Sequence, residues 1–256
     1  MIHATAIVSE KATVAGDVEI GPYSIIGDDV EIGSGTRIDS HVVIKGPTTI
    51  GRDNRIYQFA ALGDDPQDKA YGGEPTRLVV GDRNTIREYV TFSRGTAKDR
   101  GVTAVGDDNW IMAHSHIAHD CVVGDNVVMA NNTALAGHVY IGDWVICGGN
   151  SGVHQFCKIG AHAFLGMFSA VNRDIPAYSM VSGQPAVLRG INSEGLRRRG
   201  FAAEQIRNIK RAYRIAFRSG RKLADALEEI EALAAGQPEL DPFLDSLRSS
   251  ERGLAR

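Results

Sequence analysis

The sequence is poor in aromatic residues and in cysteine. Phe, Trp and Tyr together make up 7% of its 256 residues, so few large side chains are available to fill a core. Its three cysteines, Cys121, Cys147 and Cys157, have no CxxC spacing and cannot all pair with one another. This pattern argues against a disulfide framework and favours free thiols in a cytoplasmic protein.

Signals for secretion and membrane insertion are also missing. The N-terminal sequence MIHATAIVSEKATVAGDVEI has no basic stretch followed by an apolar one, so we expect no signal peptide. No segment approaches the ~18 consecutive apolar residues that span a bilayer. We therefore expect a cytoplasmic protein without stable membrane insertion.

Glycine, in contrast, is abundant, with 29 residues, and many of them belong to a repeat of six. An apolar residue occupies every sixth position from Ile2 to Leu62, from Val80 to Phe92 and from Val105 to Val171. Neither an α-helix, with its period of about 3.6, nor an amphipathic strand, with its period of about 2, gives this spacing. Short strands joined by tight turns do, and three such units close a triangular coil of roughly 18 residues.

The repeat therefore predicts an all-β, parallel β-helix in residues 1–190. Its two interruptions, near residues 63–79 and 95–104, predict loops that leave the solenoid, and loops of this length are candidates for function. The sequence of residues 191–256 predicts a C-terminal α-helical domain that covers the open end of the solenoid. Ser193 and Asp241 are the expected N-caps of its helices.

The net charge of −3 hides a basic segment. Between Arg189 and Lys222 eleven basic residues face only Glu194 and Glu204, which gives this segment a charge of +9. A basic segment on an acidic chain indicates an acidic partner or a phosphate-bearing ligand. Nucleic acid is a weaker candidate, because no RNA- or DNA-binding motif accompanies the charge.

Histidines gather in the second half of the repeat. Coils of roughly 18 residues align His119 with Gly137 and Gln155 in one column. His138 and His154 then lie one residue away from this column, on the same edge of the solenoid. The sequence therefore predicts a cluster of imidazoles.

Two chemistries compete for this cluster. A histidine can act as a general base on a hydroxyl that attacks a thioester, and Asp120 would raise the basicity of its neighbour His119. Zinc is the alternative, because the spacing of His114 and His119 resembles that of hexapeptide-fold carbonic anhydrases. Those enzymes need a third histidine two coils upstream, where coil arithmetic gives Leu78, so we expect no metal.

Longer motifs carry a more specific resemblance. The segments QDKAYGGEPTRLVVGDRNTIRE, AHSHIAHDCVVGD, NNTALAGHVYIGD, GVHQF and INSEGLRRRGF closely resemble the UDP-N-acetylglucosamine O-acyltransferases, which catalyse the first step of lipid A synthesis. The resemblance covers essentially the whole chain. It implies left-handed winding, which the spacing alone does not give because parallel crossovers are generally right-handed. It also implies transfer of an (R)-3-hydroxyacyl group from acyl carrier protein to the 3-hydroxyl of UDP-N-acetylglucosamine.

The resemblance further implies roles for individual residues. His119 would be the general base, tuned by Asp120, and the backbone N–H of Gly137 would lie in the oxyanion hole. Asp68 would contact the glucosamine. His116, His138, His154 and Gln155 would line the sugar and pantetheine region, and Asn192, Glu194, Arg198 and Arg199 would hold uridine and phosphates.

Met167 shares a column with Gly149 and Asn131, on a different face from His119. In the family this position limits acyl-chain length, and methionine there predicts a medium chain, 3-hydroxydecanoyl rather than 3-hydroxymyristoyl. The alternative is a methionine that fills the core. One departure is that some relatives have a lysine two residues after the aspartate that corresponds to Asp68. Here that position is Ala70, beside Lys69.

The implied assembly is a homotrimer, because one solenoid face offers no deep pocket whereas three-fold packing creates three clefts. The implied donor, acyl carrier protein, is acidic and would suit the basic segment. We expect no cofactor beyond the phosphopantetheine of that donor. Two rival classes fit less well. The sister N-acyltransferases carry an extra N-terminal domain, whereas the repeat here begins at residue 2. A non-catalytic scaffold would not need the histidine cluster.

Overall fold

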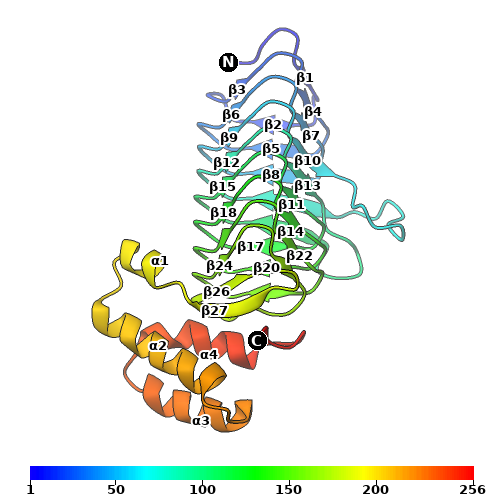
Figure 1. Cartoon of the computed structure of the whole chain (residues 1–256). Coiled ribbons are helices and arrows are strands. Elements are labelled where there is room, and N and C mark those ends of the chain that lie inside the picture. Colours follow the sequence, from blue (N-terminus) through cyan, green and yellow to red (C-terminus); the bar gives the residue numbers. More distant parts are fainter.

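The computed structural model describes residues 1–256, which form a triangular solenoid followed by a small group of helices (Figure 1). The solenoid is a left-handed parallel β-helix, so the predicted fold class is confirmed. Its strands belong to three sheets, which we number 1, 2 and 3 in the order in which the chain enters them. We name the three edges of the prism after the sheets that they join.

Sheet 1 consists of β1 (Ile7–Val8), β4 (Ile25–Ile26), β7 (Val43–Ile44), β10 (Ala61–Asp64), β13 (Thr91–Ser93), β16 (His116–Ile117), β19 (Ala134–Leu135), β22 (Gly152–Val153) and β25 (Ala170–Val171). Sheet 2 consists of β2 (Thr13–Val14), β5 (Val30–Ile32), β8 (Thr48–Ile50), β11 (Arg77–Val80), β14 (Val102–Val105), β17 (Val122–Val123), β20 (Tyr140–Ile141) and β23 (Lys158–Ile159). Sheet 3 consists of β3 (Glu19–Ile20), β6 (Arg37–Ile38), β9 (Arg55–Ile56), β12 (Thr85–Ile86), β15 (Trp110–Ile111), β18 (Val128–Met129), β21 (Ile146–Cys147), β24 (Phe164–Leu165), β26 (Ser179–Ser182) and β27 (Val187–Ile191).

The apolar residue of each hexad points into the prism. Ile117 pairs with Leu135 and Leu135 with Val153, a register of one coil, and all three side chains are buried. Burial of such side chains stabilises each coil by roughly 1.5–3 kcal/mol per residue. The cysteines are free, as expected, and the structure buries all three; burial raises the pKa of Cys147 to about 12.

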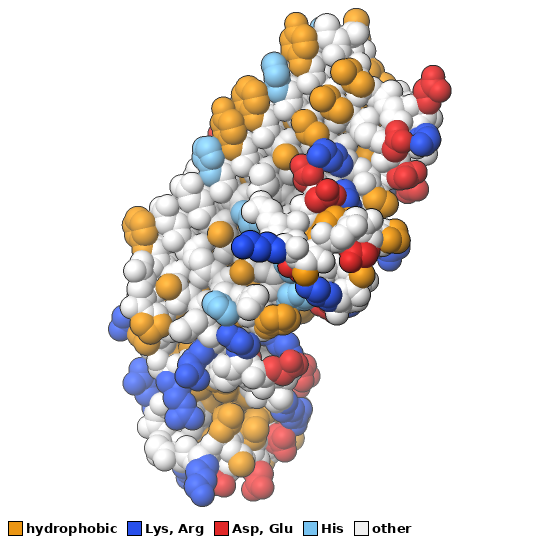
Figure 2. Space-filling view, turned by 90° about the vertical axis from the view of Figure 1, so that its right-hand side faces the viewer, with side chains coloured by type: hydrophobic (Ala, Val, Ile, Leu, Met, Phe, Trp, Pro, Cys, Tyr) orange, Lys and Arg blue, Asp and Glu red, His pale blue; other side chains and the backbone are white.

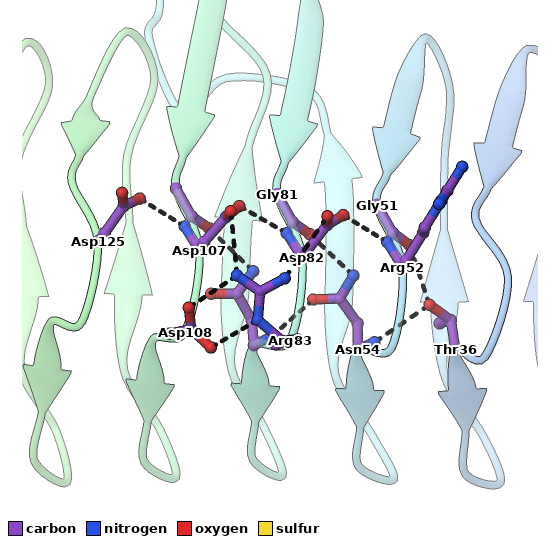
Figure 3. A network of polar contacts seen from close by, with 12 residues as sticks. Thr36, Gly51, Arg52, Asn54, Gly81, Asp82, Arg83, Asp107, Asp108 and Asp125 are labelled. Carbon is purple, nitrogen blue, oxygen red and sulfur yellow. Dashed lines mark hydrogen bonds and ion pairs between the residues drawn. The ribbon is translucent and has the colours of Figure 1, made fainter.

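Unpaired amides at the 2–3 edge are satisfied by a ladder of side chains (Figure 3). The N–H of Asp82 donates to Oδ1 of Asp107 at 2.8 Å, and the N–H of Asp107 donates to Oδ1 of Asp125 at 2.7 Å. Inside this ladder, the N–H of Asn84 donates to Oδ1 of Asn54 at 2.9 Å. Each side chain thus accepts a hydrogen bond from a backbone N–H of an adjacent coil. A corner amide without a backbone partner needs such an acceptor.

Two segments leave the solenoid on the side of sheets 1 and 2 (Figure 1). We call residues 65–76, between β10 and β11, the first excursion, and residues 94–101, between β13 and β14, the second excursion. Both are shorter than the predicted loops because the strands extend into them: Leu78 pairs with Thr103, and both side chains are buried.

The helical end consists of α1 (Ser193–Arg198), α2 (Ala203–Arg218), α3 (Leu223–Ala234), the 3₁₀-helix η1 (Pro238–Leu240) and α4 (Asp241–Arg248). The helices pack below the last coils (Figure 1), where the Tyr178 hydroxyl donates to the Glu239 carbonyl at 2.9 Å. No helix combines the length and the apolar character needed to cross a membrane.

Both predicted N-caps were wrong by one residue. The N-cap of α1 is Asn192, whose Oδ1 accepts from the N–H of Gly195 at 3.1 Å, and not Ser193. The N-cap of α4 is Leu240 and not Asp241, because η1 runs directly into α4 and leaves Asp241 inside the helix.

Candidate active site

His119 and Asp120 lie together on the 1–2 edge, in the turn between β16 and β17. Nδ1 of His119 lies 2.9 Å from Oδ2 of Asp120, whose side chain is fully buried. A carboxylate only accepts hydrogen bonds, so Nδ1 of His119 carries the proton and Nε2 is left with a lone pair. Nε2 has no partner within the chain, which is the arrangement that a general base requires.

Asp120 is held by the second excursion. Its carboxylate accepts from the N–H of Thr96 at 2.9 Å and from the Thr96 hydroxyl at 2.7 Å. Its own N–H donates to Oγ1 of Thr103 at 2.8 Å. These contacts fix the carboxylate, so the direction of the His119 ring is fixed as well.

Gly137 lies next to the His119 ring. A Cβ at this position would lie 2.5 Å from Cε1 and 2.8 Å from Nε2 of His119, so only glycine fits beside the imidazole. The N–H of Gly137 makes no hydrogen bond within the chain, in contrast to the corner amides of the 2–3 edge. A free N–H beside a general base is available to a developing oxyanion.

His138 completes the group that we call the imidazole cluster, namely His119, Asp120 and His138. Its ring meets the His119 ring edge-on, with centroids 5.1 Å apart, and stacks on Phe156 at 4.4 Å. Nδ1 of His138 lies 2.8 Å from Oδ2 of Asp99, a residue that the sequence analysis did not single out. The predicted neighbours His119, Gly137 and His138 therefore do meet.

The cluster also has the composition of a metal site, since its ligand atoms lie within 4.8 Å of one another. The Asp120 oxygens already accept from Thr96 and His119, so a cation would compete with these hydrogen bonds. Leu78 does not lie two coils above His114, as predicted, because the excursions lengthen two coils. The ring of Tyr89 stacks on His114 from the coil above, and the ring of Phe59 lies one coil further up. Neither position holds a histidine.

Asp68 reaches the second excursion from the first. Its Oδ1 accepts from the N–H of Ala70 at 2.9 Å, and its Oδ2 accepts from Nζ of Lys98 at 3.0 Å. These two donors hold the pKa of the Asp68 carboxyl below its usual value. Ala70 thus contributes its backbone N–H, and Lys69 forms no hydrogen bond or ion pair. The cation beside Asp68 is Lys98, a residue that the six-residue repeat does not predict.

His116 and His154 face a groove of about 750 Å³ on sheet 1, which Ala136 and Val171 also line. Burial lowers the pKa of His116, and its Nδ1 lies 2.7 Å from Oγ1 of Thr91. Nδ1 of His154 lies 3.2 Å from Nη2 of Arg252, in the C-terminal segment. Gln155 is exposed beside His154. His154 therefore belongs to the groove on sheet 1, and the imidazole cluster of His119, Asp120 and His138 does not include it.

The predicted uridine and phosphate residues lie elsewhere. Asn192, Glu194, Arg198 and Arg199 line a groove of about 530 Å³ beside sheet 3. Arg199 lies over the Trp144 ring at 5.2 Å and donates to Nδ1 of His162 at 3.1 Å. Burial, with the charge of Arg199, lowers the pKa of His162 to about 4. Within one chain this groove and the imidazole cluster lie on different sides of the prism.

Met167 lies on the 3–1 edge, with 64% of its surface exposed, so it does not fill the core. The basic segment lies mainly on α2 and the loops around it. Arg207, Lys210, Arg211 and Arg214 are exposed, and none forms an ion pair. Figure 2 shows Lys and Arg side chains gathered over the helical end, below a solenoid surface that has fewer of them.

Known proteins share this arrangement over the full chain. The family described as UDP N-acetylglucosamine O-acyltransferase, domain 2, matches residues 174–255, and the bacterial transferase hexapeptide family matches residues 103–137. An acyl-[acyl-carrier-protein]–UDP-N-acetylglucosamine O-acyltransferase of Thiobacillus denitrificans is 56% identical over 100% of this chain and 99% of its own length. The chain belongs to the UDP-N-acetylglucosamine O-acyltransferase family.

Solved structures of the family agree with this assignment. The UDP-N-acetylglucosamine acyltransferase of Francisella novicida is 44% identical, with a TM-score of 0.98 over 100% of this chain and 94% of that one. The UDP-N-acetylglucosamine O-acyltransferase of Moraxella catarrhalis is 48% identical, also with a TM-score of 0.98, over 100% and 99%. Family membership therefore covers the solenoid, both excursions and the helices.

Proposed function

We propose that the chain transfers an (R)-3-hydroxyacyl group from acyl carrier protein to the 3-hydroxyl of UDP-N-acetylglucosamine, with His119 as the general base. Relatives with this activity in their names match the chain from end to end. The observation that carries the proposal is His119 itself: its Nδ1 donates to the buried Asp120, and its Nε2 lies open beside the free N–H of Gly137.

In this reaction Nε2 of His119 takes the proton of the sugar hydroxyl as its oxygen attacks the thioester carbonyl. The resulting oxyanion accepts from the Gly137 N–H, a contact that contributes about 3–4 kcal/mol in comparable sites. The C–S bond then breaks, and the departing phosphopantetheine thiolate receives the proton from the His119 imidazolium. Asp120 stays ionised throughout and stabilises that imidazolium. We propose no metal and no further cofactor.

A homotrimer supports this function better than a single chain. The imidazole cluster lies on the 1–2 edge, and the groove with Arg198 and Arg199 lies beside sheet 3. A ligand that contacts both needs the groove of a neighbouring copy, and three-fold symmetry supplies one for every cluster. The arginine forks suit the diphosphate of the acceptor.

Finer assignments of individual residues belong to the same proposal. The exposed Met167 limits the acyl chain of a neighbouring site, which favours 3-hydroxydecanoyl over 3-hydroxymyristoyl. The unpaired arginines and Lys210 of α2 dock the acidic carrier protein. Asp68, with Lys98, contacts the glucosamine, while His116, His138, His154 and Gln155 line the sugar and pantetheine region, and Asn192 and Glu194 contact the uridine.

The test is an acyl-transfer assay with UDP-N-acetylglucosamine and 3-hydroxydecanoyl carrier protein, followed by mass spectrometry of the product. His119→Asn is expected to lower kcat by at least about 100-fold, the usual contribution of a general base. His41→Asn, the same change at an exposed histidine of the 3–1 edge, is the matched control. Equal activity of His119→Asn and the control would refute the role of His119, and no product with wild-type protein would refute the reaction.

A further inference from the structure

The second excursion contacts three of the predicted site residues within a stretch of four positions. Thr96 donates to Asp120, Lys98 donates to Asp68, and Asp99 accepts from His138. None of these three contacts comes from the repeat itself. The excursion therefore acts as a strap across the 1–2 edge. Apart from its hydrogen bonds to Asp120, its shortest contact with a predicted site residue is the one between Asp99 and His138.

The Asp99 contact determines which nitrogen of His138 carries the proton. Oδ2 of Asp99 lies 2.8 Å from Nδ1 of His138, and a carboxylate can only accept. Nδ1 is therefore protonated. The ring cannot turn away freely, because Phe156 stacks on its face at an interplanar angle of 9°. The His138 side chain is 14% exposed, so water competes little for its nitrogens.

The other nitrogen of His138 faces the carboxylate that serves His119. Nε2 of His138 lies 3.9 Å from Oδ2 of Asp120, the same oxygen that accepts from Nδ1 of His119. A proton on Nε2 would make His138 a second donor for this oxygen after a small movement of the ring. With the proton held on Nδ1 by Asp99, the neutral His138 offers Asp120 no donor.

We propose that Asp99 is a positioning residue that fixes the tautomer of His138 and so reserves Asp120 for His119. The proposal rests on the acyl-transfer function in one respect, the effect on rate. Its structural part stands alone: loss of Asp99 frees His138 to donate from Nε2 to Asp120, which weakens the hydrogen bond that orients the general base. Orientation errors of this kind lower the rate without removing any group that contacts substrate.

The tautomer is measured directly by long-range ¹H–¹⁵N correlation spectra of the full chain labelled with ¹⁵N-histidine, at about pH 8, where an ordinary histidine is neutral. The His138 signals are identified by their loss in His138→Asn, a change that the left-handed backbone of His138, with φ 63°, accommodates. The wild-type protein is expected to carry the His138 proton on Nδ1, and Asp99→Ala is expected to move it largely to Nε2. Asp108→Asn is the control: it removes a carboxylate that is about as exposed as Asp99 but pairs with Arg83 on the 2–3 edge, and it should leave the His138 tautomer unchanged.

Kinetics test the consequence. Asp99→Ala is expected to lower kcat about tenfold, the effect of losing one charge-assisted hydrogen bond, with KM for UDP-N-acetylglucosamine unchanged within about twofold. Asp99→Asn keeps an acceptor oxygen and is expected to recover most of the loss. A wild-type His138 without a proton on Nδ1, or an Asp99→Ala protein with unchanged tautomer and kcat, would overturn the proposal. A wild-type protein with the expected tautomer but no acyl transfer would instead refute the proposed function.

Discussion

The Cα of Gly137 faces the imidazole of His119 so closely that a side chain at position 137 would overlap the ring. The nearest atom, Cε1 of His119, would lie 2.5 Å from an added Cβ. Gly137→Ala is therefore expected to displace His119 and to lower kcat by about 100-fold, the typical result of a shift of about 1 Å in a catalytic group.

The effect of Gly137→Ala is measured in the acyl-transfer assay together with thermal unfolding. Gly16→Ala is the control, because a Cβ added at Gly16 meets no atom within 4 Å. If Gly137→Ala retained the kcat of the control protein, the close packing against His119 would have no catalytic importance.

His162, in the turn between β23 and β24, gives the free energy of unfolding a defined pH dependence. Its folded-state pKa is lowered to about 4, from an ordinary value of 6.5, by burial and by Arg199, which donates to its Nδ1. Between these two values the unfolded chain binds more protons than the folded chain, so the free energy of unfolding rises as pH rises from about 4 to 6.5. His162→Asn, at a position with φ 61°, is expected to flatten this rise in the melting temperature.

Acidic groups also titrate in this pH window, so the informative quantity is the difference between wild type and variant. His3→Asn, at an exposed residue of the first coil, is expected to leave the slope unchanged. Identical slopes for all three proteins would show that the folded chain does not lower the pKa of His162.

The solenoid could be predicted from the sequence because its signal is local and repeated. Each hexad independently indicates one inward side chain, so errors at single positions do not alter the result. The same regularity placed His119, Gly137 and His138 together, since no insertion separates their coils. Leu78 was wrongly placed two coils above His114, because the two excursions lengthen the coils that separate His114 from Phe59, which occupies that place.

Lys98, Asp99 and Arg252 could not be found in this way. Their partners, Asp68, His138 and His154, lie 30, 39 and 98 residues away in the chain, and no periodicity relates them. The contacts arise from how irregular segments fold back on the solenoid, which depends on tertiary packing. The sequence also did not predict that the imidazole cluster and the groove with Arg198 and Arg199 lie on different sides of the prism, because this depends on which sheet each strand joins.

Met167 provides a test of chain-length selection. Because its side chain is 64% exposed on the 3–1 edge, Met167→Gly should leave the solenoid folded. If Met167 limits the acyl groove, its removal should shift the ratio of rates from 3-hydroxydecanoyl toward 3-hydroxymyristoyl carrier protein by about 200-fold, the value of four buried methylenes at about 0.8 kcal/mol each. An unchanged ratio in competition between the two donors would refute this role.

The carrier-docking surface is tested by charge reversal on α2. Arg211→Glu is expected to raise the KM for the carrier-linked donor roughly fivefold, equivalent to about 1 kcal/mol, and KM should also rise with salt concentration. Lys11→Glu, a reversal on an exposed residue of the first coils, serves as the control. If both variants behaved alike, the carrier would dock away from α2.

Mixing two inactive variants tests whether one site uses residues from two chains. His119→Asn removes the base from the 1–2 edge, and Arg199→Ala removes a guanidinium from the groove beside sheet 3. If each site combines one edge with the groove of a neighbour, equal mixing into random trimers leaves about a quarter of the sites with both residues intact. Co-refolding the two variants should then restore about a quarter of the wild-type activity, whereas either variant refolded alone should stay inactive. A site contained within one chain predicts no restoration, because every chain in the mixture lacks one of the two residues.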